Sequence, residues 1–140
     1  TGPNAARVGG GTIDVSAISG PEAGVANLGY VKGLREGWYA LFNPQLHLGI
    51  GLTWPLDTFP YLWLWQEFHG SQDYPWYGST YVMGVEPHSS IPGHGLLRAI
   101  ERGTARWLDP GERVEADIRA SLFEGDEPIR RIAPDGSVER

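Results

Sequence analysis

The segment Tyr61–Phe68, with the sequence YLWLWQEF, indicates the fold most directly. Large side chains occupy both faces of this alternating stretch, which is typical of a central strand covered on both sides. Trp63 and Trp65 share one face with Glu67, so this face is either plain core or part of a pocket wall. The position of Glu67 favours a pocket, because a buried carboxylate needs a partner.

A second alternating segment, Leu46–Trp54, predicts a strand with unequal faces. We expect its leucine and isoleucine side to be buried. The other side carries Gly49, Gly51 and Thr53, so another backbone or a ligand could come close there. Further strands are predicted at Thr12–Ile18, Asn27–Lys32, Trp38–Phe42, Thr80–Glu86 and Thr104–Leu108. The pair Asn27–Lys32 and Trp38–Phe42 is expected to form a hairpin across Gly33–Gly37.

The C-terminal part continues this pattern with one exception. Gly95–Arg102 has the spacing of a short helix or of an irregular crossing, and Asp109–Gly111 is a turn signal. Glu112–Phe123 fits a long strand better than a helix, and residues 125–140 predict a terminal hairpin. We therefore expect a mainly β protein, an antiparallel β-sandwich. Residues 1–140 form one such domain or the C-terminal half of a larger one.

The composition restricts the possible partners. The chain has a net charge of -6 and no evident basic patch, which argues against binding to nucleic acid or to an anionic membrane. No apolar run is long enough to span a bilayer. The chain has no cysteine, which excludes disulfides and is compatible with a reducing compartment; we expect the cytoplasm. Its histidines (His47, His69, His88 and His94) show no recognised ligand spacing, so no metal site is predicted.

Glu86 is the strongest candidate for chemistry. It ends the strand that begins at Thr80, and Pro87 is expected to end that strand at once. A carboxylate beside aromatic rings suits a sugar, and it could act as a general base toward a sugar hydroxyl. Alternatively, Glu86 caps a turn or pairs with an arginine. A glycosidase pair with Glu67 is a weaker possibility, because the sequence cannot give the separation of two carboxylates.

The order of these elements resembles the C-terminal part of the aldose 1-epimerase (galactose mutarotase-like) family. The resemblance extends over Trp38–Glu124. It rests on Val85-Glu86-Pro87 at a strand end, on Pro92-Gly93 shortly after it, and on Leu108-Asp109-Pro110-Gly111-Glu112 before a long strand. It implies part of a β-supersandwich, no cofactor, and Glu86 as the base that takes the anomeric proton. None of the histidines matches the catalytic acid of that family.

The sequence thus predicts a sugar anomerase with a small-molecule sugar as its partner. Two other functions stay open: a non-catalytic carbohydrate-binding module, and a half-domain whose open sheet edges need a homodimer or a companion chain. The residues expected to bind the sugar, besides the catalytic Glu86, are Trp63, Trp65, Glu67, Trp76 and His88.

Overall fold

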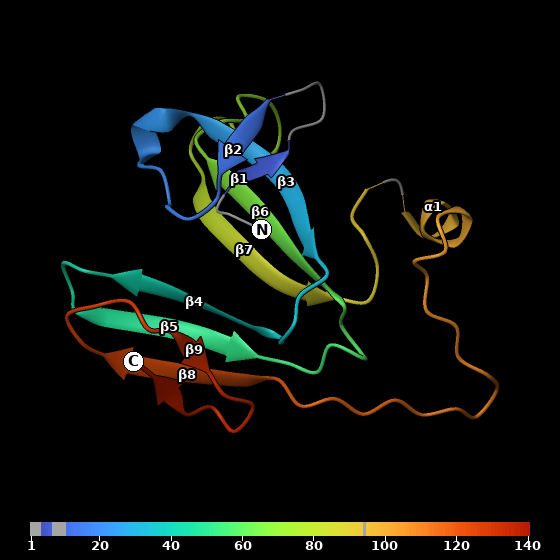
Figure 1. Ribbon diagram of the computed structural model, residues 1–140. Coiled ribbons are helices and arrows are strands. Elements are labelled where there is room, and N and C mark those ends of the chain that lie inside the picture. Colours follow the sequence, from blue (N-terminus) through green and yellow to red (C-terminus); the bar gives the residue numbers. More distant parts are fainter. Residues whose placement is uncertain (1–3, 7–10, 94) are drawn as a thin grey trace. The chain divides into compact units, whose positions relative to one another are not determined.

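The computed structural model describes residues 4–6, 11–93 and 95–140 (Figure 1). Strands dominate and pair in antiparallel fashion, so the predicted mainly β, antiparallel class is confirmed. The elements, in chain order, are β1 (Asn4–Ala6), β2 (Thr12–Asp14), η1 (Pro21–Ala23), β3 (Val25–Lys32), β4 (Trp38–Asn43), β5 (Leu48–Thr53), β6 (Tyr61–Phe68), β7 (Tyr81–His88), α1 (Gly95–Glu101), β8 (Arg119–Glu124), β9 (Arg131–Ile132) and β10 (Val138–Glu139).

The chain divides into two compact units. The smaller unit contains residues 1–27 and 65–84, and the larger unit contains residues 28–64 and 85–140. The boundaries fall inside β3, β6 and β7, which form a three-stranded sheet in the order β3-β6-β7. Within the described residues, no helix is both long and apolar enough to cross a bilayer.

The central position predicted for Tyr61–Phe68 is confirmed, because β6 lies between β3 and β7. β3 does not pair with β4, so the hairpin expected across Gly33–Gly37 is wrong. Instead, β4 pairs with β5. Since both three-stranded sheets take strands from distant parts of the chain, short-range turn signals could not predict the pairing.

The second sheet has the order β4-β5-β8 and lies entirely within the larger unit. Its buried face is the opposite of the predicted one. Gly49, Gly51 and Thr53 are buried, whereas Leu48 and Ile50 are 46% and 44% exposed. The glycines are buried because neighbouring side chains fill the space above them. Phe42 and Phe123, which flank Gly49 in the sheet, have nearly parallel rings 6.4 Å apart.

The C-terminal hairpin covers the same face, as the close approach predicted for the glycines requires. β9 pairs with β10 in the hairpin expected for residues 125–140, and β9 contacts both β4 and β5. Ile132 is 2% exposed, and its Cδ1 occupies the space that a side chain at Gly51 would need. The small residues of β5 therefore allow the hairpin to pack directly on the sheet.

Three other predicted elements are shorter than expected or absent. β2 ends at Asp14 because the Asp14 carboxylate accepts hydrogen bonds from the Ser16 amide and hydroxyl, which turns the chain. Thr104–Leu108 forms no strand, and of Glu112–Phe123 only β8 does. The helical alternative for Gly95–Arg102 is confirmed as α1, and the turn at Asp109–Gly111 is closed by a bond from the Glu112 amide to the Asp109 carbonyl.

The packing over β5 predicts unequal responses to adding a methyl group. Gly49→Ala should lower the free energy of unfolding by about 1–3 kcal/mol, because the new Cβ overlaps the Phe123 ring. Gly29→Ala in β3 is the matched control; its Cβ meets no atom, and we expect a change within about 0.5 kcal/mol. Denaturant unfolding of the two variants checks this. Equal effects would contradict the proposed packing.

Candidate functional site

Glu86 lies near the end of β7, but Pro87 does not end the strand as expected. β7 continues to His88. The reason is that β7 is an edge strand of its sheet, where a residue without an N–H costs no ladder hydrogen bond on the free side. Because side chains alternate along a strand, Glu86 and His88 project from the same face. The persistence of the strand past Pro87 therefore brings a carboxylate and an imidazole together.

Glu86, His88 and Trp63 form a contact cluster in the larger unit, here called the Glu86 cluster. Nε2 of His88 is 3.4 Å from Oε2 of Glu86. The imidazole stacks on the Trp63 ring with centroids 3.6 Å apart and planes 8° from parallel. Trp63 is fixed in turn, since its Nε1 donates to the Ser90 carbonyl at 2.6 Å. Three of the predicted site residues are thus brought together.

The Glu86 cluster remains accessible to solvent. The side chains of His88 and Glu86 are 36% and 44% exposed. A hollow of about 250 Å³ is lined by Ser89, the residue after His88, and by Tyr61 of β6, but not by Trp63, Glu86 or His88. Within the described residues, Glu86 pairs with no arginine or lysine. The arginine-pairing alternative for Glu86 is therefore not realised, and the carboxylate is available to a ligand.

The other predicted aromatic residues belong to the smaller unit. Trp65 and Trp76 contact each other there, with ring centroids 5.2 Å apart and planes tilted by 49°. Trp63 and Trp65 occupy neighbouring positions on one face of β6 but have different partners, His88 and Trp76. The predicted sugar-binding residues therefore form two groups, and only one of them contains Glu86.

Glu67 is 2% exposed and organises the loop that follows β6. Its Oε1 accepts hydrogen bonds from the amides of Gly70 and Ser71, both at 2.9 Å, and its Oε2 accepts one from the Ser71 hydroxyl at 2.6 Å. These bonds, the Ser71 hydroxyl first among them, lower the pKa of the Glu67 carboxyl. They account for the burial of Glu67 without a ligand.

The same loop is held by His69. Its Nδ1 lies 2.6 Å from the Gly78 carbonyl, and its backbone adopts a left-handed conformation with φ of 58°. The backbone amide of His69 donates to the Thr80 carbonyl, and the amide of Gly78 donates to the Ser71 carbonyl. The loop thus has a defined conformation and carries Tyr74 and Tyr77, which are 81% and 65% exposed.

His47 pairs with Asp126 at 2.9 Å on the surface, and His94 lies outside the described residues. In the described part of the chain, no three His, Asp or Glu side chains form a group that could hold a metal ion.

Sequence reasoning missed a cavity of about 540 Å³ at one end of the sheet β4-β5-β8. Its lining residues come from four separate segments, among them Arg35, Trp38 and Arg119. Only the strand register brings Trp38 and Arg119 to the same end of the sheet, each opposite Thr53. No local motif could have identified this set.

Comparison with known proteins gives a family without an assigned activity. The chain belongs to the family described as a domain of unknown function (DUF4432), which matches residues 6–122. No curated protein and no solved structure matches the chain. The epimerase-like function is therefore a proposal that depends on the residues themselves.

The depressed pKa of Glu67 predicts an acid-sensitive loop. The ionised carboxylate stabilises the fold above its ordinary pKa of 4.5, and this contribution is lost as the pH falls through the lower pKa of the folded state. Glu67→Gln should reduce stability at pH 7 and flatten the loss of stability below about pH 4.5. Unfolding followed by tryptophan fluorescence across this pH range checks it.

The control for this experiment is Glu127→Gln, which changes an exposed glutamate of the larger unit. It should leave the acid profile close to that of the unsubstituted protein. If Glu67→Gln behaved like Glu127→Gln, the role assigned to the loop hydrogen bonds would be wrong.

Proposed function

We propose that this chain is a carbohydrate-active protein of the aldose 1-epimerase type, in which Glu86 is the base for interconversion of sugar anomers. One observation supports this most directly: the partly exposed Glu86 carboxylate contacts His88, which stacks on Trp63. A carboxylate accepts a proton, and aromatic rings favour the apolar C–H face of a sugar. The resemblance of Val85–Pro87 and Leu108–Glu112 to aldose 1-epimerases adds to this.

In the proposed reaction, Glu86 takes the proton of the anomeric hydroxyl. The electron pair of that O–H bond forms the C1 carbonyl as the bond from C1 to the ring oxygen breaks, and the ring oxygen takes up a proton from a donor. Rotation about C1–C2 presents the other face of the carbonyl. The ring oxygen then attacks C1 and loses its proton, and Glu86 returns its proton to the carbonyl oxygen. No metal or organic cofactor takes part.

His88 is a positioning residue in this proposal. Stacking on Trp63 fixes the imidazole plane, and the 3.4 Å contact then restricts the Glu86 carboxylate. A restricted base loses less conformational freedom when it meets the substrate. We place the reaction in the cytoplasm, which suits a chain without cysteine.

Replacement of the base tests the proposal. Glu86→Gln should slow anomerisation of glucose or galactose by about 100-fold or more, because the amide cannot accept the proton in the transition state. Rates are measured by polarimetry and by exchange NMR. Glu124→Gln, which changes an exposed glutamate at the end of β8, is the matched control and should retain the rate. An unchanged rate in Glu86→Gln with intact folding would rule out the base role.

A non-catalytic carbohydrate-binding module is the second candidate, and the loop after β6 favours it. Tyr74 and Tyr77 are exposed, lie edge to face at 6.1 Å, and stand on a loop held by Glu67 and His69. Exposed rings on an ordered loop can stack on sugars at a low entropic cost.

The two candidates predict different variants to be sensitive. If the loop binds sugar, Tyr77→Ala should weaken the response of tryptophan fluorescence to a sugar panel by about tenfold, whereas Glu86→Gln should leave it unchanged. If the Glu86 cluster is the site, the reverse holds. Binding that is independent of both residues would contradict both candidates.

A further inference from the structure

The cavity of about 540 Å³ is outside the Glu86 cluster, since Trp63, Glu86 and His88 do not line it. Its size falls within the usual range for small-molecule sites. All of its lining residues belong to the larger unit, and they come from the start of β4, the end of β5, the segment before β8, and the C-terminal hairpin. Several independent segments thus converge on one hollow.

One wall of the cavity is aromatic and apolar. Trp38, Thr53 and Arg119 are cross-strand neighbours on β4, β5 and β8, so their side chains leave the sheet on one face. Ile132 and Pro134 of the hairpin region line the same cavity. Trp54, which is 5% exposed, also contributes and is fixed by a bond from its Nε1 to the Phe59 carbonyl. An indole surface of this kind suits the C–H face of a sugar ring.

Thr53 adds a polar group to this wall. It is 4% exposed, and its side chain leaves the sheet on the same face as those of Trp38 and Arg119. Its side chain borders the cavity.

Two charges at the cavity already have partners. The Glu36 carboxylate receives two hydrogen bonds from Arg131, both at 2.7 Å, and Arg131 also binds Glu139 at 2.6 Å. These bonds lower the pKa of Glu36, so the pair stays ionised and mutually satisfied. Glu115 lies 3.6 Å from Arg113. Neither carboxylate is a free charge of the cavity.

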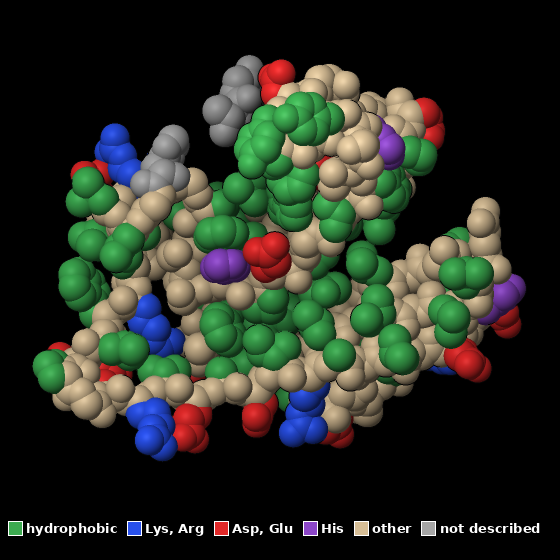
Figure 2. Space-filling model, turned by 180° about the vertical axis from the view of Figure 1, so that it is seen from behind, with side chains coloured by type: hydrophobic (Ala, Val, Ile, Leu, Met, Phe, Trp, Pro, Cys, Tyr) green, Lys and Arg blue, Asp and Glu red, His purple; other side chains and the backbone are tan. Residues whose placement is uncertain are grey.

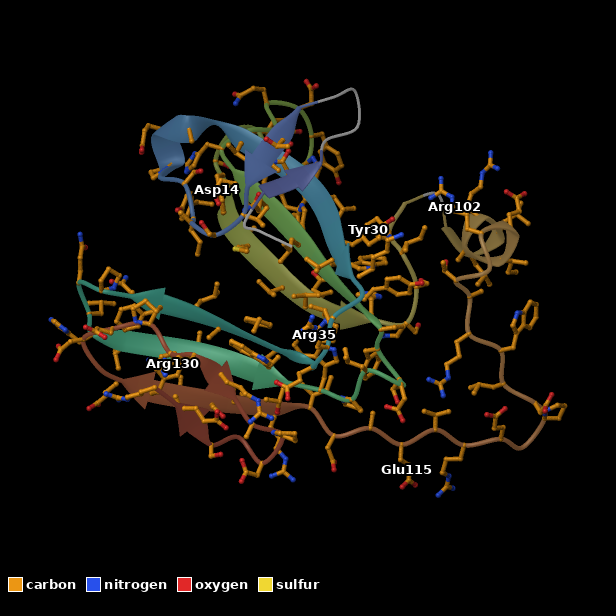
Figure 3. All side chains as sticks on the ribbon, in the orientation of Figure 1. Asp14, Tyr30, Arg35, Arg102, Glu115 and Arg130 are labelled. Atoms are coloured by element: carbon orange, nitrogen blue, oxygen red, sulfur yellow. The ribbon has the colours of Figure 1, made fainter. Side chains whose placement is uncertain are left out.

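The guanidinium groups of Arg35 and Arg119 differ in this respect. Within the described residues, neither forms an ion pair. Figure 3 shows Arg35 near the start of β4 and Glu115 on the extended segment that leads to β8. Figure 2 shows acidic and basic side chains next to each other along the lower edge of the view. Of the unpaired charges on the lining, two are positive and one, Asp117, is negative.

We infer that this cavity binds a monosaccharide that carries one anionic group, a carboxylate or a phosphate. The forked donors of Arg35 and Arg119 match such a group, and the indole of Trp38 packs against the sugar ring. Asp117 and Thr53 accept hydrogen bonds from ring hydroxyls. Within the described residues, the lining carries two arginines without an ion pair and three carboxylates, of which Glu36 and Glu115 have arginine partners. This inference goes beyond the proposed function, because it does not require Glu86 to act as a base.

Calorimetric titration tests it with four probes: glucuronate, glucose 6-phosphate, glucose and inorganic phosphate. We expect saturable binding of at least one anionic sugar, weaker binding of inorganic phosphate, and no comparable binding of glucose. Arg35→Met and Arg119→Met should each raise the Kd about tenfold or more. Arg102→Met is the matched control, because it removes an exposed arginine that neither lines the cavity nor pairs with one of its carboxylates. Glu86→Gln should also leave the Kd unchanged.

The inference would be overturned by absence of binding by both anionic sugars, by equal affinity for glucose, or by equal affinity for inorganic phosphate. If Arg119→Met unfolds the strand, Arg35→Met in the exposed loop still tests the anion contact, and Arg119→Lys keeps the charge while losing the fork. A change in Kd with Glu86→Gln would assign the binding to the Glu86 cluster instead. If Glu86→Gln abolishes anomerisation but leaves the Kd of the anionic sugar unchanged, the two sites are separate.

Discussion

The edge position of β7 is the constraint on which the proposed site depends. An interior strand could not hold Pro87 without losing a ladder hydrogen bond, and the chain would turn away after Glu86. At the edge, β7 continues to His88, so that Glu86 and His88 share a face. Because β6 is the neighbouring strand, Trp63 stacks on that histidine. Strand pairing, one proline and side-chain alternation thus suffice to place a carboxylate, an imidazole and an indole together.

The second constraint is the small face of β5. Gly49 and Gly51 make room for Phe123 from β8 and for Ile132 from β9. The same packing places the C-terminal hairpin over the sheet and forms one wall of the cavity near Trp38 and Arg119. As a consequence, Leu48, Ile50 and Leu122 remain exposed on the other face of this sheet. The residues that look least informative in the sequence therefore determine which face is covered.

Local patterns predicted part of this structure. Alternation located β3 to β8 approximately, and the central role of β6 followed from its two large faces. The buried face of β5 was predicted wrongly, because hydrophobicity alone does not show that glycines will be covered by aromatic rings from other strands. The predicted site residues were found in two groups. The contact between Glu86 and His88 follows from their spacing, whereas Glu67 serves the loop of Gly70 and Ser71 and Trp65 contacts Trp76. Partners at long sequence separation could not be read from spacing.

The most direct test of the central claim is an NMR titration that follows the indole N–H signals as glucose or galactose is added. Trp63 has its own signature, because its Nε1 donates to the Ser90 carbonyl while His88 covers its ring. If the Glu86 cluster binds the sugar, the Trp63 signal should shift in a saturable manner, and Glu86→Gln should weaken that shift. A saturable shift confined to other tryptophans, with Trp63 unchanged, would contradict the account.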